Sequence, residues 1–72
     1  SIMKFELIMI ICSALFGQCS TPTKQTPLFI SHYECATVGY LRSLKTLDSM
    51  GADLVNNNKI IISFKCNDII IS

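Results

Sequence analysis

Hydrophobic residues gather into three stretches along the chain, separated by short polar segments. The first is a nearly continuous apolar run from Leu7 to Phe16, which follows Lys4 and Glu6. A positive charge followed by about 7–15 apolar residues is the pattern of a signal peptide, whereas a membrane-spanning helix needs about 20 apolar residues. The run has no polar side, so a helix there would need covering all round. The pattern predicts an apolar N-terminal helix within residues 1–19, interpreted as a signal peptide or, alternatively, as a retained membrane anchor.

A polar segment over residues 20–27 separates this run from the rest of the chain. It is rich in Thr and Pro and has no apolar periodicity. Pro22 and Pro27 lack amide donors, and each biases the preceding residue away from helix. We expect an extended linker here.

The second stretch has the periodicity of a helix. Ser31 and Glu34 form a capping box that predicts a helix start, and Gly51 is a natural helix stop. Gly39 inside the helix costs about 1 kcal/mol relative to Ala, which suggests a close contact there. Apolar and small side chains recur at three- and four-residue spacing, so they are expected to pack on a sheet as one face: Tyr33, Thr37, Tyr40, Leu41, Leu44 and Leu47.

The third stretch, from Lys59 to Cys66, alternates as a strand does. Its expected core face, which should contact the helix, consists of Ile60, Ile62, Phe64 and Cys66. We expect a break at residues 67–68 and a further strand at residues 69–71, paired within this chain or with a neighbouring copy. Residues 28–30 are compatible with an edge strand. Residues 28–72 are therefore predicted to form a small α+β domain, with one main helix packed on a short β-hairpin or a two- to three-stranded sheet.

Size and composition restrict the classes of protein that remain. The chain has 72 residues, of which 50% are hydrophobic and 15% charged, with a formal net charge of +1. It is too short for two domains, too apolar for disorder throughout and not basic enough to indicate nucleic-acid binding. So small a core is only marginally stable unless it is reinforced.

The four cysteines offer that reinforcement. A helix and a returning strand would bring Cys35 and Cys66 together as a disulfide, although Cys35 lies nearly opposite Leu44 on a helical wheel. If the N-terminal segment is retained, Cys12 and Cys19 are the complementary pair. Lipidation of Cys19 is another alternative, since a Ser/Thr/Pro tether follows it.

Candidate catalytic and metal-binding groups are sparse. The single histidine, His32, lies beside Ser31 and Cys35, but a Cys–His pair needs a third, orienting group. A zinc set of Cys19, His32, Cys35 and Cys66 lacks any Cys-x-x-Cys pair. We expect too little chain for a substrate pocket of several hundred cubic ångströms. The sequence therefore predicts a non-enzymatic protein with no cofactor, no metal and no small-molecule substrate.

The whole layout resembles the very short exported proteins of marine bacteria and their phages. The resemblance rests on Met3-Lys4 with the apolar run that follows, Gly17-Gln18-Cys19, Tyr33-Glu34-Cys35, Gly39-Tyr40 with Ser43-Leu44-Lys45, and Ile62-Ser63-Phe64-Lys65-Cys66. It implies export and a frame of cysteines, with no assigned activity.

Two hypotheses on function follow. The first is a small exported accessory or interaction protein of the periplasm or cell envelope, encoded by a bacterium or a phage. The second is a structural subunit of a membrane complex, filament or virion that retains its apolar N-terminal helix and self-associates. The expected partner is another protein or a second copy, bound through the Ile-rich C-terminal strand, with membrane contact through Leu7–Phe16 as a further option and no nucleic acid.

Overall fold

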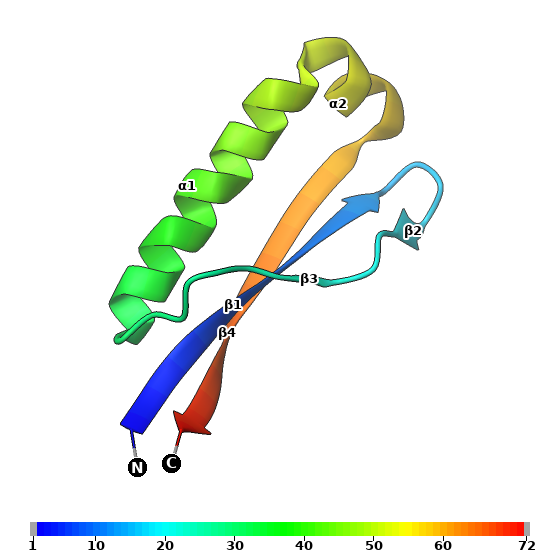
Figure 1. The fold of residues 1–72 in the computed structure, drawn as a ribbon. Coiled ribbons are helices and arrows are strands. Elements are labelled where there is room, and N and C mark those ends of the chain that lie inside the picture. The colour runs from blue at the N-terminus through cyan, green and yellow to red at the C-terminus, as the bar shows by residue number, and fades with distance from the viewer. Residues whose placement is uncertain (1, 72) are drawn as a thin grey trace.

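Two long antiparallel strands, twisted about each other, run the length of the molecule, and one long helix lies beside them (Figure 1). The computed structural model describes residues 2–71. The elements in chain order are β1 (Ile2–Ser13), β2 (Gln18–Cys19), β3 (Thr23–Lys24), α1 (His32–Met50), α2 (Ala52–Asn58) and β4 (Ile60–Ile71). All four strands belong to one sheet, in which every pairing is antiparallel. The α+β class predicted from the sequence is confirmed, with a larger sheet than expected.

The predicted apolar N-terminal helix is wrong, because this segment is strand β1, which lies inside the sheet. Leu7 and Met9 point to the helix-covered face and are buried, while Ile8 and Ile10 lie on the opposite face. Since both faces of β1 are apolar, the sequence lacks the polar alternation that normally marks a strand. Its β-branched isoleucines nevertheless fit an extended, paired backbone.

Strands β1 and β4 pair without interruption, from Ile2 opposite Ile71 to Ser13 opposite Ile60. The break predicted at residues 67–68 is wrong: Asn67 and Asp68 lie within the ladder, opposite Glu6 and Phe5. Twelve consecutive pairs hold these two polar residues in strand geometry despite their low β-propensity. The C-terminal isoleucines at 69–71 therefore find their partners within this chain.

The other edge of β1 is covered by a discontinuous strand. Cys19 pairs with Cys12, Thr23 pairs with Met9, and Phe29 forms a bridge with Phe5. The ladder is interrupted around residues 22 and 27, which are both proline and have no amide to donate. The predicted linker over residues 20–27 is thus partly a strand, and residues 28–30 contribute one bridge.

The predicted limits of the main helix are confirmed. Ser31 caps it, since its Oγ accepts a hydrogen bond from the Glu34 amide at 3.1 Å, and Gly51 ends it at φ 87°. Helix α2 then runs from Ala52 to Asn58 and includes three consecutive asparagines at residues 56–58. The left-handed residue that ends α2 is Lys59, at φ 52°.

The rotation of α1 about its axis differs from the prediction. Cys35 and Gly39 face the sheet and are buried, whereas Tyr33, Tyr40, Leu41 and Leu44 are exposed. The disulfide at Cys35 sets this rotation. So does Gly39, since a Cβ there would lie 2.7 Å from Cζ of Phe64. The close contact predicted at Gly39 is confirmed, as is the core face of β4, whose Ile62, Phe64 and Cys66 pack on the core. The core consists of Leu7, Met9, Phe29 and Cys35 with these partners.

Candidate interaction surface

Two disulfides fix the elements from which the surface is built. Cys35, at the start of α1, is bonded to Cys66 of β4 with a Cα–Cα distance of 6.2 Å, and Cys35 is fully buried. The bond attaches the N-terminal turn of α1 to β4. This is the pair expected from a helix followed by a returning strand.

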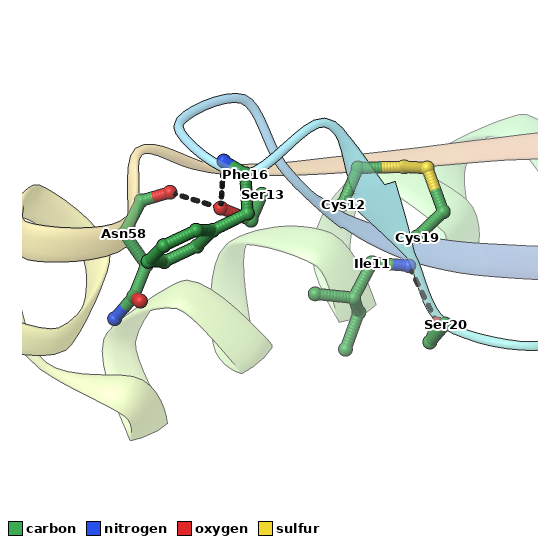
Figure 2. Close-up of a disulfide and its surroundings, with 7 residues drawn as sticks. All are labelled: Ile11, Cys12, Ser13, Phe16, Cys19, Ser20 and Asn58. Atoms are coloured by element: carbon green, nitrogen blue, oxygen red, sulfur yellow. Dashed lines mark hydrogen bonds between the residues drawn. A yellow bond between two sulfur atoms is a disulfide. The ribbon is translucent and has the colours of Figure 1, made fainter.

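The second disulfide joins Cys12 of β1 to Cys19 of β2 across the turn between them (Figure 2). Ser13 fastens the same turn to α2, because its Oγ accepts from the Phe16 amide and donates to the Asn58 carbonyl at 2.7 Å. The sulfur of Cys19 is held in this bond, so lipidation of Cys19 would require that the bond be absent.

The outer edge of β4 carries backbone groups that the sheet does not use. The carbonyl of Lys59 accepts a hydrogen bond from the Ala14 amide, so the residues of this register face β1. On β1, Phe5, Leu7 and Ile11 direct their backbone groups away from β4, toward the segment of residues 18–29 on the other side. In an antiparallel ladder, residues alternate between those facing one neighbour and those facing the other. The amides and carbonyls that point outward from β4 are therefore those of Ile60, Ile62, Phe64, Cys66, Asp68 and Ile70. Among the described residues no strand pairs with this edge.

A groove runs between this edge and α1. It is open, measures about 580 Å³, and is bounded by His32, Ala36 and Tyr40 on the helix and by residues 62–66 on β4. The ring of Tyr40 meets that of Phe64 edge-on, with centroids 4.8 Å apart. An extended chain paired with β4 would thus find an apolar and aromatic wall beside its backbone.

The face of α1 that points away from the sheet continues this surface. Tyr33 is 81% exposed, Tyr40 71% and Leu44 66%, and Leu41 lies beside them. We call these four residues the outer stripe. Single exposed apolar residues are ordinary, but an apolar row along one helix face is typical of a surface that contacts another molecule.

His32, Ser31 and Cys35, the residues considered for catalysis, do not form a catalytic arrangement. His32 is exposed and lies edge-on to the ring of Phe5, with centroids 6.0 Å apart, and the neighbouring Cys35 sulfur is in a disulfide. Within residues 2–71, no three His, Cys, Asp or Glu side chains gather as metal ligands. Neither α1 nor α2 combines the length and hydrophobicity that a bilayer-crossing helix requires.

The groove beside β4 measures several hundred cubic ångströms but is open along its length, so the expectation about a substrate pocket stays a prediction. Helix α1 packs on β1 and β4, and open hollows lie along both of its sides.

Comparisons with protein families, with curated proteins and with solved structures found no match to this chain. Sequence reasoning identified the Ile-rich strand as a pairing element. It missed the outer stripe, which it assigned to the core, and the groove, which depends on the rotation of α1.

Proposed function

We propose that this chain is a small, non-enzymatic interaction protein of an oxidising compartment, such as the periplasm or the cell envelope, and that it acts by strand addition at the edge of β4. The observation that carries the proposal is the long outer edge of β4, whose outward amides and carbonyls are unpaired among the described residues. Unpaired strand edges bind extended chains through main-chain hydrogen bonds. The two disulfides support the choice of compartment, because such bonds persist where thiols are not kept reduced.

The partner is a second copy of the chain. A two-fold axis at Cys66 lets β4 pair with itself antiparallel, so that the same surface serves both copies. Phe64 then faces Asp68 of the second copy, and Lys65 faces its Asn67. No like charges lie opposite each other, and the outward groups of both strands can form about ten hydrogen bonds.

The position of α1 fits this arrangement. The helix packs on both β1 and β4, so its axis lies above that pair of strands. In a sheet continued through two β4 strands, the two helices would be separated by about two strand spacings, roughly 9–10 Å. Packed helices lie about 8–10 Å apart. The two helices would overlap only at their N-terminal turns, because each starts beside Cys66 at the axis and runs toward the Ile60 end of its own β4. The groove-side residues His32, Ala36 and Tyr40 would form this short contact.

Proline substitution tests the proposal because neighbouring residues of β4 direct their amides to opposite sides. The Asp68 amide points to the outer edge, so Asp68→Pro should abolish the dimer and leave the fold intact. The matched control is Asn67→Pro, which removes an amide directed at β1 and should destabilise the monomer. Association is measured by sedimentation equilibrium and folding by circular dichroism.

Wild-type protein that stays monomeric at millimolar concentration, or an Asp68→Pro variant that dimerises as tightly as wild type, would refute self-association through β4. A second measurement does not depend on any variant folding. Hydrogen exchange of the wild type should show protection of the Ile62, Phe64 and Cys66 amides that rises with protein concentration. Protection that does not change with concentration contradicts the proposal.

A further inference from the structure

A second hollow lies on the opposite side of α1 from the groove, between the helix and the residue 20–25 segment. It is an open cleft of about 330 Å³. Met9 and Ile11 of β1 form its floor, and Arg42 and Lys45 of α1 form its helix wall. We call it the basic cleft. Its volume is at the lower end of the range for small-molecule sites, about 300–1,000 Å³.

The lining of the basic cleft is positively charged and rich in hydroxyl groups. None of its nine lining residues is acidic. Hydroxyls come from both walls, including Ser20 and Thr23 on the sheet side and Thr46 on the helix. The one nearby carboxylate on the helix, Asp48, lies with Lys45 around a separate hollow on the outer side of α1. Lys45 is therefore shared between the two hollows, and Arg42 is the cation that belongs to the cleft.

Arg42 is half-buried and lies above an apolar floor. Its Nη1 donates to Oε1 of Gln25 at 3.5 Å, which is a long contact. A guanidinium carries five N–H donors in a fork that matches a carboxylate or phosphate. This single long contact leaves most of the fork available to a ligand in the cleft.

The rotation of α1 accounts for this placement. Cys35 and Gly39 hold one side of the helix against the sheet, and Arg42 and Thr46 follow on that same side at helical spacing. Their polar ends thereby reach over Met9 and Ile11, while the apolar outer stripe points away. A polar helix side turned toward an apolar sheet is the reverse of ordinary amphipathic packing.

From these contacts we infer that the basic cleft binds an anionic amphiphile, a molecule with a carboxylate or phosphate head and a short hydrocarbon chain. The head pairs with Arg42 and accepts a hydrogen bond from the Ser20 hydroxyl, whose oxygen accepts from the Ile11 amide and whose hydrogen is free, whereas the Thr46 hydroxyl already donates to the Arg42 carbonyl. The hydrocarbon chain lies on Ile11 and on the exposed edge of Met9. Lys45 adds long-range attraction at the rim. The inference is independent of the dimer at β4, because the cleft lies on the other side of the helix.

Titration with decanoate, followed by amide chemical shifts, tests the inference. Saturable shifts at Ser20, Thr23 and Thr46 are expected, with none from decyltrimethylammonium, which has the same chain and the opposite charge. Arg42→Met keeps the apolar stem and removes the charge, so it should weaken decanoate binding by about tenfold or more. Lys45→Gln should weaken it by a smaller factor. Lys65→Gln, on β4, is the matched control and should leave it unchanged.

Binding to phosphatidylglycerol vesicles, measured by flotation and lost in Arg42→Met, would identify the natural source of the head group as a lipid surface. Binding of decanoate alone would indicate a free fatty acid. The inference is overturned if decanoate produces no saturable shifts, if the cationic analogue binds equally well, or if Arg42→Met binds like wild type. In that last case the arginine stem merely covers Met9.

Discussion

The two disulfides should contribute unequally to stability, and the difference follows from the lengths of chain that they close. The Cys35–Cys66 bond spans a sequence separation of 31 and the Cys12–Cys19 bond a separation of 7. The chain-entropy relation gives about 3.7 kcal/mol for the longer loop and about 2.4 kcal/mol for the shorter one. Cys35 is also fully buried, so its replacement by alanine removes packed sulfur as well. We expect the double variant Cys35→Ala/Cys66→Ala to lose about 4–5 kcal/mol and Cys12→Ala/Cys19→Ala about 2–2.5 kcal/mol.

Urea denaturation followed by circular dichroism measures both losses, and each double variant is the control for the other. A chain of this length has a total stability of about 4–11 kcal/mol, so the Cys35/Cys66 variant should be largely unfolded at the lower end of that range. The reasoning fails if the Cys12/Cys19 variant loses as much as the Cys35/Cys66 variant. It also fails if the Cys35/Cys66 variant loses less than about 1 kcal/mol.

Three further substitutions test the contact at Gly39, the rotation of α1 and the cap at Ser31. Gly39→Ala should destabilise the fold by about 1–2 kcal/mol, because the overpacking against Phe64 costs more than the gain in helix propensity. Thermal melts should show that the double variant Gly39→Ala/Phe64→Leu recovers part of this loss. A higher melting temperature for Gly39→Ala than for wild type would contradict the contact. Leu44→Ser should cost less than about 0.5 kcal/mol in urea, since Leu44 is exposed; a loss of 2 kcal/mol or more, typical of a core leucine, would show that α1 is rotated differently. Ser31→Ala should cost about 1 kcal/mol through the lost cap, while Thr37→Ala on the exposed side serves as control, and equal losses would argue against the cap.

Local signals in the sequence predicted local structure well. The Ser31 cap, the Gly51 stop and the alternation from Ile60 to Cys66 each depend on neighbouring residues, and each is present as expected. The prediction failed where the answer depended on distant partners. Asn67 resembles a strand breaker when taken alone, yet twelve consecutive pairs with β1 hold its backbone extended.

The N-terminal run shows why periodicity could not decide between helix and strand. Leu7 and Met9 enter the core, but Ile8 and Ile10 on the other face are also apolar. A run that is apolar on both faces shows neither the two-residue alternation of a strand nor the 3.6-residue periodicity of a helix. The isoleucine content was the available signal for a strand, and the resemblance to a signal peptide outweighed it.

The rotation of α1 involved two conflicting signals. The largest apolar side chains favoured one face, and Cys35 lies nearly opposite Leu44 on the helical wheel. In the structure the disulfide and the small Gly39 determine the inward side. Four of the residues expected in the core, Tyr33, Tyr40, Leu41 and Leu44, thereby form the outer stripe, and Arg42 lines the basic cleft.

The pairing of β1 with β4 joins the two strands that lie farthest apart in sequence among the described residues, and this has a consequence for how the protein folds. Bringing such distant segments together carries a large loop-closure entropy, so folding should be slow for so small a protein. Helix α1 and the Cys12–Cys19 turn are local and can form early, but β1 lacks its main partner until synthesis has passed Ile71. The sheet therefore cannot be completed until β4 is available. The same delay leaves the apolar residues of β1 uncovered, so chaperone binding to this segment would suit the kinetics of the fold.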